Sequence, residues 1–168
     1  SIMFGELPPW HNLGFFNQLA EKFGIAIVYE SWGYHAPVPI PEEELEKVAD
    51  PVEKIARLTY GKYTEFYGVA QAHDFTTPRT SPYAKAAPEY RADGMLCHPL
   101  ISCRPATYDL LAHKNILEEK FKVPGVLVEG DIIDLRVFNE EEALSKMEAF
   151  VETMDDYREQ RKAAGMPW

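Results

Sequence analysis

The sequence predicts an α/β fold in which a sheet of about four parallel strands lies between two layers of helices. Three features of the 168-residue chain predict it. Four short apolar runs have the length of buried strands, segments with the apolar period of a helix separate them, and glycine or proline marks most boundaries. Strands that alternate with helices are typical of a parallel sheet with right-handed crossovers.

Each predicted strand is an apolar run without regular alternation of polar residues, which is the pattern of a strand buried on both faces. The four are Ile2–Glu6, Ile25–Glu30, the run that begins at Gly94, and Val123–Glu129. The second is the clearest, because it is rich in β-branched residues. Cys97 lies in the middle of the third run, so we expect it in the core.

The first predicted helix begins after Asn12, a favourable N-cap, and ends at Phe23, because Gly24 can adopt the left-handed conformation that stops a helix. Proline opens two further predicted helices, at Pro41 and Pro51. We expect all three helices to cover the sheet. The expected inward face of the third consists of Val52, Ile55, Ala56 and Leu58.

The middle of the chain carries weaker signals. We expect a helix in the first half of residues 61–88, make no assignment after it, and expect a short helix over Tyr83–Tyr90. Pro105 suits the first position of a helix that runs to Phe121.

The last predicted helix begins at Asn139, with Glu142 three residues later in a capping-box pattern. The residues from Arg158 to Trp168 are interpreted as a frayed polar tail. The apolar stripe of this helix, which we expect in the core, consists of Leu144, Met147, Phe150, Val151, Met154 and Tyr157.

Composition excludes several classes of protein. A net charge of −10 without a lysine or arginine cluster argues against a nucleic-acid partner, and no apolar run approaches the roughly 20 residues of a membrane helix. Two cysteines do not make a disulfide scaffold and are consistent with a reducing cytoplasm. We expect one domain over residues 1–168. Because the chain enters a strand at once, we expect it to be a fragment of a longer protein.

The carboxyl ends of parallel strands meet at one edge of a sheet, where ligands usually bind. In a flavodoxin-like, doubly wound sheet with strand order 2-1-3-4, a crevice opens between the first and third strands. Residues 6–10 and Cys103 would line that crevice, and Trp32 follows the second strand. Gly130 and Asp131, which close the fourth strand, share this edge.

Three side chains near the expected crevice have two interpretations each. Glu6 could be a general acid or base, or a hydrogen-bond acceptor at a helix cap. Trp10 and Trp32 could be lids on the crevice, or the packing of stiff loops.

No strand is followed by a glycine-rich phosphate loop. Metal-ligand spacing is absent among His11, His35 and His73.

Cys103 has three interpretations. It stands at the start of a predicted helix, where the helix dipole favours the thiolate that binds metal or acts as a nucleophile. It could equally be a small apolar residue in a turn. Nucleophilic catalysis has the least support, because His98 and His113 fall on a strand and within a helix. As a cluster ligand it would belong to a set completed elsewhere, since iron–sulfur clusters usually take about four cysteines.

Several stretches, in their order and spacing, span nearly the whole chain and are characteristic together. They are Gly5–Trp10, Ala92–Leu96 followed by Ser102–Arg104, Val123–Asp131, and Arg136 leading to the helix around Phe150. With them the chain resembles the 2-hydroxyacyl-CoA dehydratase and benzoyl-CoA reductase family, specifically the C-terminal part of one of its iron–sulfur subunits.

The resemblance implies that Cys103 is one of three thiolates that hold a [4Fe–4S] cluster, the other two lying in an N-terminal domain. It implies a heterodimer of related subunits and an ATP-dependent iron–sulfur activator that delivers one electron. The substrate would be an acyl-CoA, which loses water through a ketyl radical or, in the reductase branch, begins ring reduction. A cytoplasmic enzyme of anaerobic metabolism is expected, and the fragment alone is expected to be inactive.

Two other functions stay open. The chain could be a flavodoxin-like module that binds a flavin or another small molecule, or a non-catalytic structural subunit. The absence of a phosphate-binding loop counts against flavin, and Cys103 at the crevice counts for a cluster. The sequence does not separate dehydratase from reductase.

Overall fold

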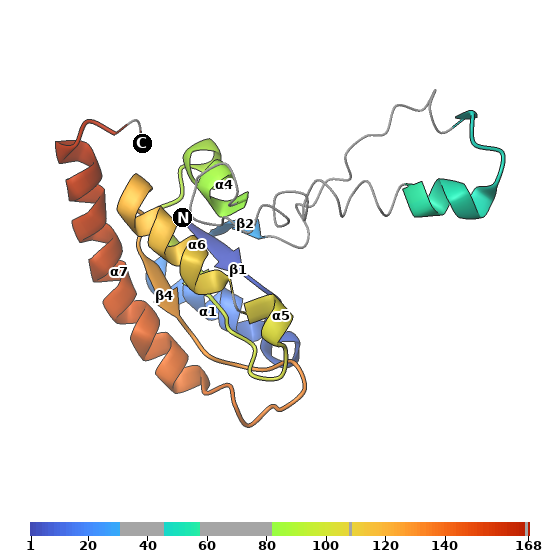
Figure 1. The fold of residues 1–168 in the computed structure, drawn as a ribbon. Coiled ribbons are helices and arrows are strands. Elements are labelled where there is room, and N and C mark those ends of the chain that lie inside the picture. Colours follow the sequence, from blue (N-terminus) through green and yellow to red (C-terminus); the bar gives the residue numbers. More distant parts are fainter. Residues whose placement is uncertain (31–45, 58–81, 108, 167) are drawn as a thin grey trace.

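The computed structural model describes residues 1–30, 46–57, 82–107, 109–166 and 168. Its sheet has four strands: β1 (Ile2–Gly5), β2 (Ile27–Glu30), β3 (Gly94–Cys97) and β4 (Gly125–Leu127). All neighbouring strands are parallel, and their order is β2-β1-β3-β4 (Figure 1). The predicted α/β class and the strand order 2-1-3-4 are therefore confirmed.

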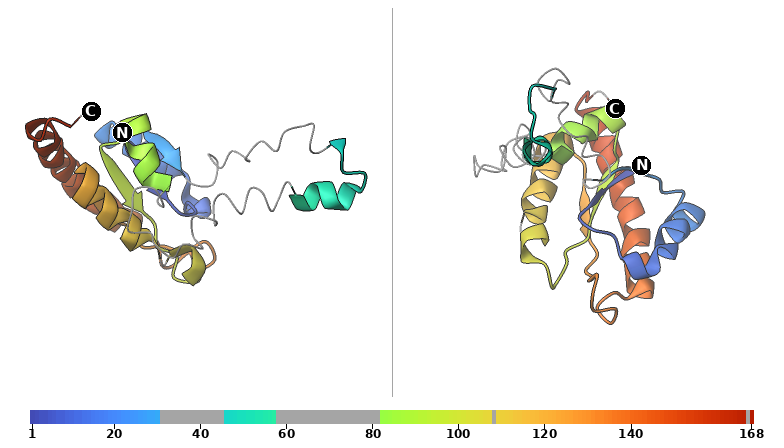
Figure 2. Two further views of the ribbon diagram at one scale, coloured as in Figure 1. Left: turned by 45° about the horizontal axis from the view of Figure 1, so that its top comes forward. Right: turned by 90° about the vertical axis from the view of Figure 1, so that its right-hand side faces the viewer.

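Helices cover both faces of the sheet, as the right-hand view of Figure 2 shows. On one face lie α1 and α7, and on the other α4, α6 and the π-helical turn η3. The three-layer arrangement is confirmed. The bounds are η1 Trp10–Asn12, α1 Gly14–Phe23, α4 Pro82–Tyr90, α5 Arg104–Thr107, α6 Leu110–Ile116, η3 Leu117–Phe121 and α7 Glu140–Ala163.

Two apolar clusters form the core, one on each face of the sheet. Successive side chains of a strand point to opposite faces. Phe4 accordingly packs with α1 and α7, whereas Met3 packs with α4 and α6. In β3, Leu96 lies in the same cluster as Phe4, and Cys97 lies in the same cluster as Met3; each is 1% exposed. β1 and β3 are buried throughout, which explains their continuous apolar runs, whereas the edge strands β2 and β4 are only partly buried.

The start of the first helix differs from the prediction. Asn12 lies in η1, and α1 begins at Gly14 without a side-chain cap. The amide of Asn12 instead donates to a carboxylate oxygen of Glu140 at the start of α7. Asn12 is therefore not the N-cap, because its side chain connects two elements. Gly24 ends α1 with φ +63°, as predicted.

The predicted helix from Pro105 to Phe121 is broken into α5, α6 and η3. The hydroxyl of Thr107 accepts from the backbone N–H of Leu100 at 2.9 Å and lies 3.0 Å from the carbonyl of Cys103. These bonds hold α5 against the loop after β3. Apolar periodicity predicted a helical segment but not these side-chain to backbone bonds, so the prediction of one continuous helix was wrong.

The C-terminal segment is not a frayed tail. Helix α7 is capped by Asn139 as predicted, but it continues to Ala163. Arg161 is fully buried, with Nη2 2.9 Å from Oδ1 of Asp93 and Nη1 donating to the carbonyl of Lys122 at 2.7 Å. A buried ion pair therefore orders residues that their polarity alone assigned to solvent.

A helix over residues 51–57 begins at Pro51 as predicted. Its expected inward face is wrong where the structure describes it, because Val52 and Ile55 are 70% and 65% exposed. Periodicity predicts an apolar stripe but not what covers it. The helix expected to start at Pro41, the helix expected in the first half of residues 61–88, and Leu58 lie outside the described residues.

Candidate functional site

The carboxyl ends of the parallel strands meet at one edge of the sheet, shown by the arrowheads in Figure 1. Glu6 follows β1, Cys103 follows β3, and Asp131 follows β4. Trp10 lies in η1 beyond β1 and is 58% exposed. The structure thus brings these four residues to the predicted edge, while Trp32 lies outside the described residues.

The two cysteines lie in different environments, and both are free thiols. Burial raises the pKa of Cys97 to about 12, so this residue stays a neutral thiol in the core. Cys103 is half-buried in the turn before α5. Its backbone N–H donates to the carbonyl of Leu100 at 3.3 Å, which fixes the turn. Of the two thiols, Cys103 is the one a metal can reach.

Asp131 fixes the loop that carries Cys103. One carboxylate oxygen accepts from the backbone N–H of Ser102 at 2.7 Å. The other accepts from the N–H groups of Ile133 at 2.7 Å and Asp134 at 3.1 Å. A hydrogen bond with the Ser102 side chain, together with these backbone bonds, lowers the pKa of Asp131. Asp131 therefore stays ionised and joins the end of β4 to the residue before Cys103.

His98 is a site residue that sequence reasoning assigned only to a strand. Its backbone N–H donates to the carbonyl of Gly5 at 3.1 Å, and its Nδ1 lies 2.8 Å from the carbonyl of Leu7. The ring is 1% exposed, and Nε2 has no partner among the described residues. Glu6, between the two bonded carbonyls, has a left-handed φ of +75°. His98 thus joins the segments that follow β1 and β3, at the edge where a crevice is expected.

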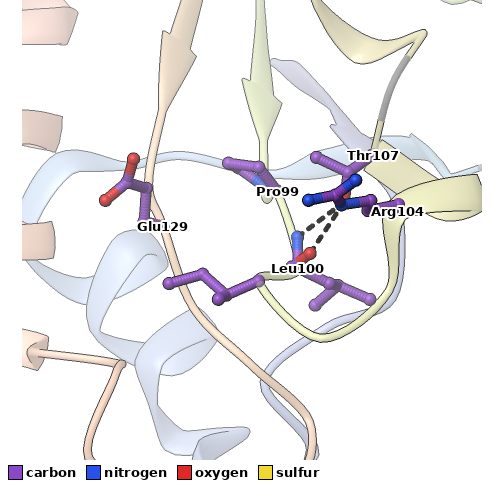
Figure 3. Close-up of a pocket in the computed structure, with 6 residues that line it drawn as sticks. Pro99, Leu100, Arg104, Thr107 and Glu129 are labelled. Atoms are coloured by element: carbon purple, nitrogen blue, oxygen red, sulfur yellow. Dashed lines mark hydrogen bonds between the residues drawn. The ribbon is translucent and has the colours of Figure 1, made fainter.

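A pocket of about 340 Å³ opens beside the turn that carries Cys103 (Figure 3). It lies between the segments that follow β3 and β4. Glu6, Trp10 and Cys103 are not among its lining residues, although Arg104 directly follows Cys103. The lining residues are Pro99, Leu100, Ile101, Arg104, Thr107 and Glu129.

The donors near Cys103 fit one ligand of a cluster. Among the described residues, no group of three or more His, Cys, Asp or Glu side chains could hold a metal ion. Cys97 is buried and protonated, so the described residues offer a single accessible thiol. A cluster at this edge would need further ligands from other residues.

The residues that the structure describes contain no helix that is long and apolar enough to span a membrane.

Residues 1–154 match the family of the 2-hydroxyglutaryl-CoA dehydratase D-component. The chain belongs to this family. Its sequence is also 25% identical over 109 residues to one of the subunits of benzoyl-CoA reductase from Thauera aromatica. That match covers 65% of this chain and 23% of the reductase polypeptide, so the chain corresponds to less than a quarter of its relative's length. The resemblance found in the sequence is thereby confirmed for this dehydratase-family chain.

Acid should destabilise this family member through His98. Burial, together with His11, lowers the pKa of His98 below its ordinary 6.5, although the Leu7 carbonyl and Asp131 oppose the shift. Below pH 6.5 the unfolded chain binds a proton that the folded chain resists, so the free energy of unfolding falls. Urea midpoints at about pH 7.5 and about pH 5.5 should therefore differ more in the wild type than in His98→Phe. Equal losses in both proteins would show that His98 is not the group responsible.

Proposed function

We propose that this chain is the C-terminal part of an iron–sulfur subunit of a 2-hydroxyacyl-CoA dehydratase, and that Cys103 is one ligand of its [4Fe–4S] cluster. The observation that carries the proposal is the position of Cys103. It is half-buried at the carboxyl edge of the sheet, beside a pocket, in a chain whose family is that of a dehydratase component. The remaining ligands would come from residues outside this chain.

The bound cluster would supply one-electron transfer to a coenzyme A thioester. The net dehydration would be redox-neutral, because hydroxide would leave the α-carbon and a proton the β-carbon, which together make water. The described residues contribute position rather than acid–base chemistry. Asp131 fixes the turn before Cys103 through Ser102, and His98 joins the segments that follow β1 and β3.

The proposed enzyme needs two protein partners. One is a related second subunit, and the other is an ATP-dependent activator that delivers the electron. The net charge of −10 and the absence of a basic cluster disfavour nucleic acid as a partner. We propose a cytoplasmic location, which the two free thiols support.

A reductase of the same family is the second candidate. The match to the benzoyl-CoA reductase polypeptide favours it, since the same one-electron step could begin ring reduction instead of releasing water. The two candidates share Cys103 and the pocket. They differ in the product, which is an enoyl thioester in one case and a reduced ring in the other.

The test is anaerobic reconstitution of the full-length subunit and, in parallel, of residues 1–168 alone. We expect a stoichiometric [4Fe–4S] absorption band only in the full-length subunit, because residues 1–168 supply one good ligand. With the second subunit and the activator, the full-length protein should convert a 2-hydroxyacyl-CoA to the enoyl thioester, and residues 1–168 should not. A stoichiometric cluster on residues 1–168 alone would contradict the shared ligand set. Ring reduction without dehydration would favour the reductase.

A further inference from the structure

His98 packs against a glycine in the segment after β4 that no larger residue could replace. A Cβ on Gly130 would overlap Nε2 of His98 and would lie 2.9 Å from Cε1 of the same ring, which is closer than real Cβ atoms come. The φ of Gly130 is not positive, so this glycine is needed for space and not for its backbone conformation. The ring of His98 therefore lies directly against the backbone of Gly130.

Gly130 is paired with the segment that leads into Cys103. It forms a parallel β-bridge with Leu100, in which its N–H and its carbonyl bond to the residues on either side of Leu100 at 3.3 and 3.2 Å. The next residue, Asp131, accepts from the N–H of Ser102 at 2.7 Å. The segment after β4 thus holds the turn that carries Cys103, and the histidine ring contacts the residue at the centre of this pairing.

The other ring nitrogen of His98 bonds to the segment after β1. Nδ1 lies 2.8 Å from the carbonyl of Leu7, and a carbonyl can only accept, so Nδ1 carries the proton. Nε2 is then the unprotonated nitrogen of a neutral ring. It has no partner among the described residues, and the ring is 1% exposed. One neutral ring therefore joins the segments that follow β1, β3 and β4.

The surroundings of the ring favour its neutral form. The ring centroids of Phe4 in β1 and Phe138 before α7 lie 5.9 and 6.2 Å from that of His98. The titratable groups that face it are His11 in η1 and Asp131 after β4. Burial lowers the pKa of His98 below its ordinary 6.5, and the attraction of Asp131 does not outweigh burial. A proton on Nε2 would place a charge and a further N–H group in this apolar contact.

We propose that His98 is the positioning residue of the Cys103 turn, which its neutral ring holds in place through Gly130. When the turn opens, the ring meets water and binds a proton readily, whereas the closed turn resists that proton. Acid therefore opens the turn before it unfolds the sheet. The contact itself is independent of any cluster. Its consequence, a cluster ligand held in one position, rests on the proposed function.

Hydrogen exchange measures the turn directly, in the full-length subunit prepared without its cluster. The reporter is the N–H of Ser102, which exchanges only when its bond to Asp131 is broken. The reference is the N–H of Met95 in β3, which donates to the carbonyl of Pro124 at 2.9 Å and reports on the sheet. Mass spectrometry of short overlapping peptides gives both protection factors, corrected for the intrinsic effect of pH on exchange.

The pH profile separates positioning from a general effect on the fold. Between about pH 7.5 and about pH 5.5, the protection of Ser102 in the wild type should fall severalfold relative to that of Met95, with about tenfold as the limit for a ring whose ordinary pKa is 6.5. In His98→Asn, whose amide can still donate to the carbonyl of Leu7 but does not titrate, this ratio should stay constant. A parallel fall at both amides of the wild type, or the same fall in His98→Asn, would overturn the proposal.

Gly130→Ala tests the contact without a change of pH. The added methyl group should displace the ring and lower the protection of Ser102 about tenfold. Gly125→Ala, at the other end of β4, is the matched control, because its methyl group meets only the flexible side chain of Lys114. Since His98→Ala removes the overlap, the double variant Gly130→Ala with His98→Ala should lose less protection than the two single losses added together.

Wild-type protection of Ser102 in Gly130→Ala, or strictly additive losses in the double variant, would contradict the proposal. If Gly130→Ala does not fold, the pH profile of His98→Asn decides alone. Neither measurement needs iron. A subunit that shows the expected losses but forms no cluster would therefore support the positioning of Cys103 by His98 and refute the role of Cys103 as a cluster ligand.

Discussion

Asp93→Asn is expected to destabilise the fold by about 3 kcal/mol, because it leaves the buried guanidinium of Arg161 without its anion. Oδ1 of Asp93 lies 2.9 Å from Nη2 of Arg161, whose side chain is 0% exposed, and 3.2 Å from Nε of Arg158. Although burial alone would raise the pKa of Asp93, the hydrogen bond from Arg158 lowers it. The carboxylate is therefore ionised at neutral pH. Urea unfolding followed by circular dichroism measures the loss.

An exposed pair of the same kind provides the control. Asp134 accepts from Nη2 of Arg136 at 2.7 Å, but the Arg136 side chain is 90% exposed. Asp134→Asn should leave the urea midpoint almost unchanged, because water screens and replaces such a pair. The double variant Asp93→Asn with Arg161→Met should recover part of the stability lost in Asp93→Asn. If Asp93→Asn unfolds at the wild-type midpoint, the buried pair does not stabilise the contact between α7 and the sheet.

This pair also shows where sequence reasoning fails. The apolar runs predicted all four strands, and the reason is clearest for β1 and β3, because strands buried on both faces must exclude polar residues. Strand order followed from the doubly wound pattern. The segment around Arg161 was misassigned because nothing in its local composition points to Asp93, which is 68 residues away. Burial of a charge depends on a partner that only the folded chain brings close.

The candidate site was predicted in its location but not in its detail. Topology places Glu6, Trp10, Cys103 and Asp131 at one edge, and the structure does so too. The expected crevice between β1 and β3 stays a prediction, and the detail missed there is His98, which bonds to the backbone after β1. A histidine in an apolar run gives no sign of this contact. The pocket at Arg104 also depends on how two loops meet, which periodicity does not report.

Cys103→Ala is expected to remove the cluster from the full-length subunit, which is the largest functional effect that the proposal predicts. Truncation removes a bond to iron, and no other described thiol can replace it, since Cys97 is 1% exposed within a core cluster. Cys97→Ala should instead leave the cluster in place and open a small cavity, at a cost of about 1 kcal/mol in stability. The two variants differ by the same atoms and therefore control for each other.

The iron content of these two variants, purified anaerobically as full-length subunits, tests the central claim most directly. The proposed function predicts wild-type iron in Cys97→Ala and a loss of the [4Fe–4S] cluster in Cys103→Ala, with both proteins folded by circular dichroism. Wild-type iron in a folded Cys103→Ala variant, or loss of iron in Cys97→Ala alone, would contradict the assignment of Cys103 as the cluster ligand.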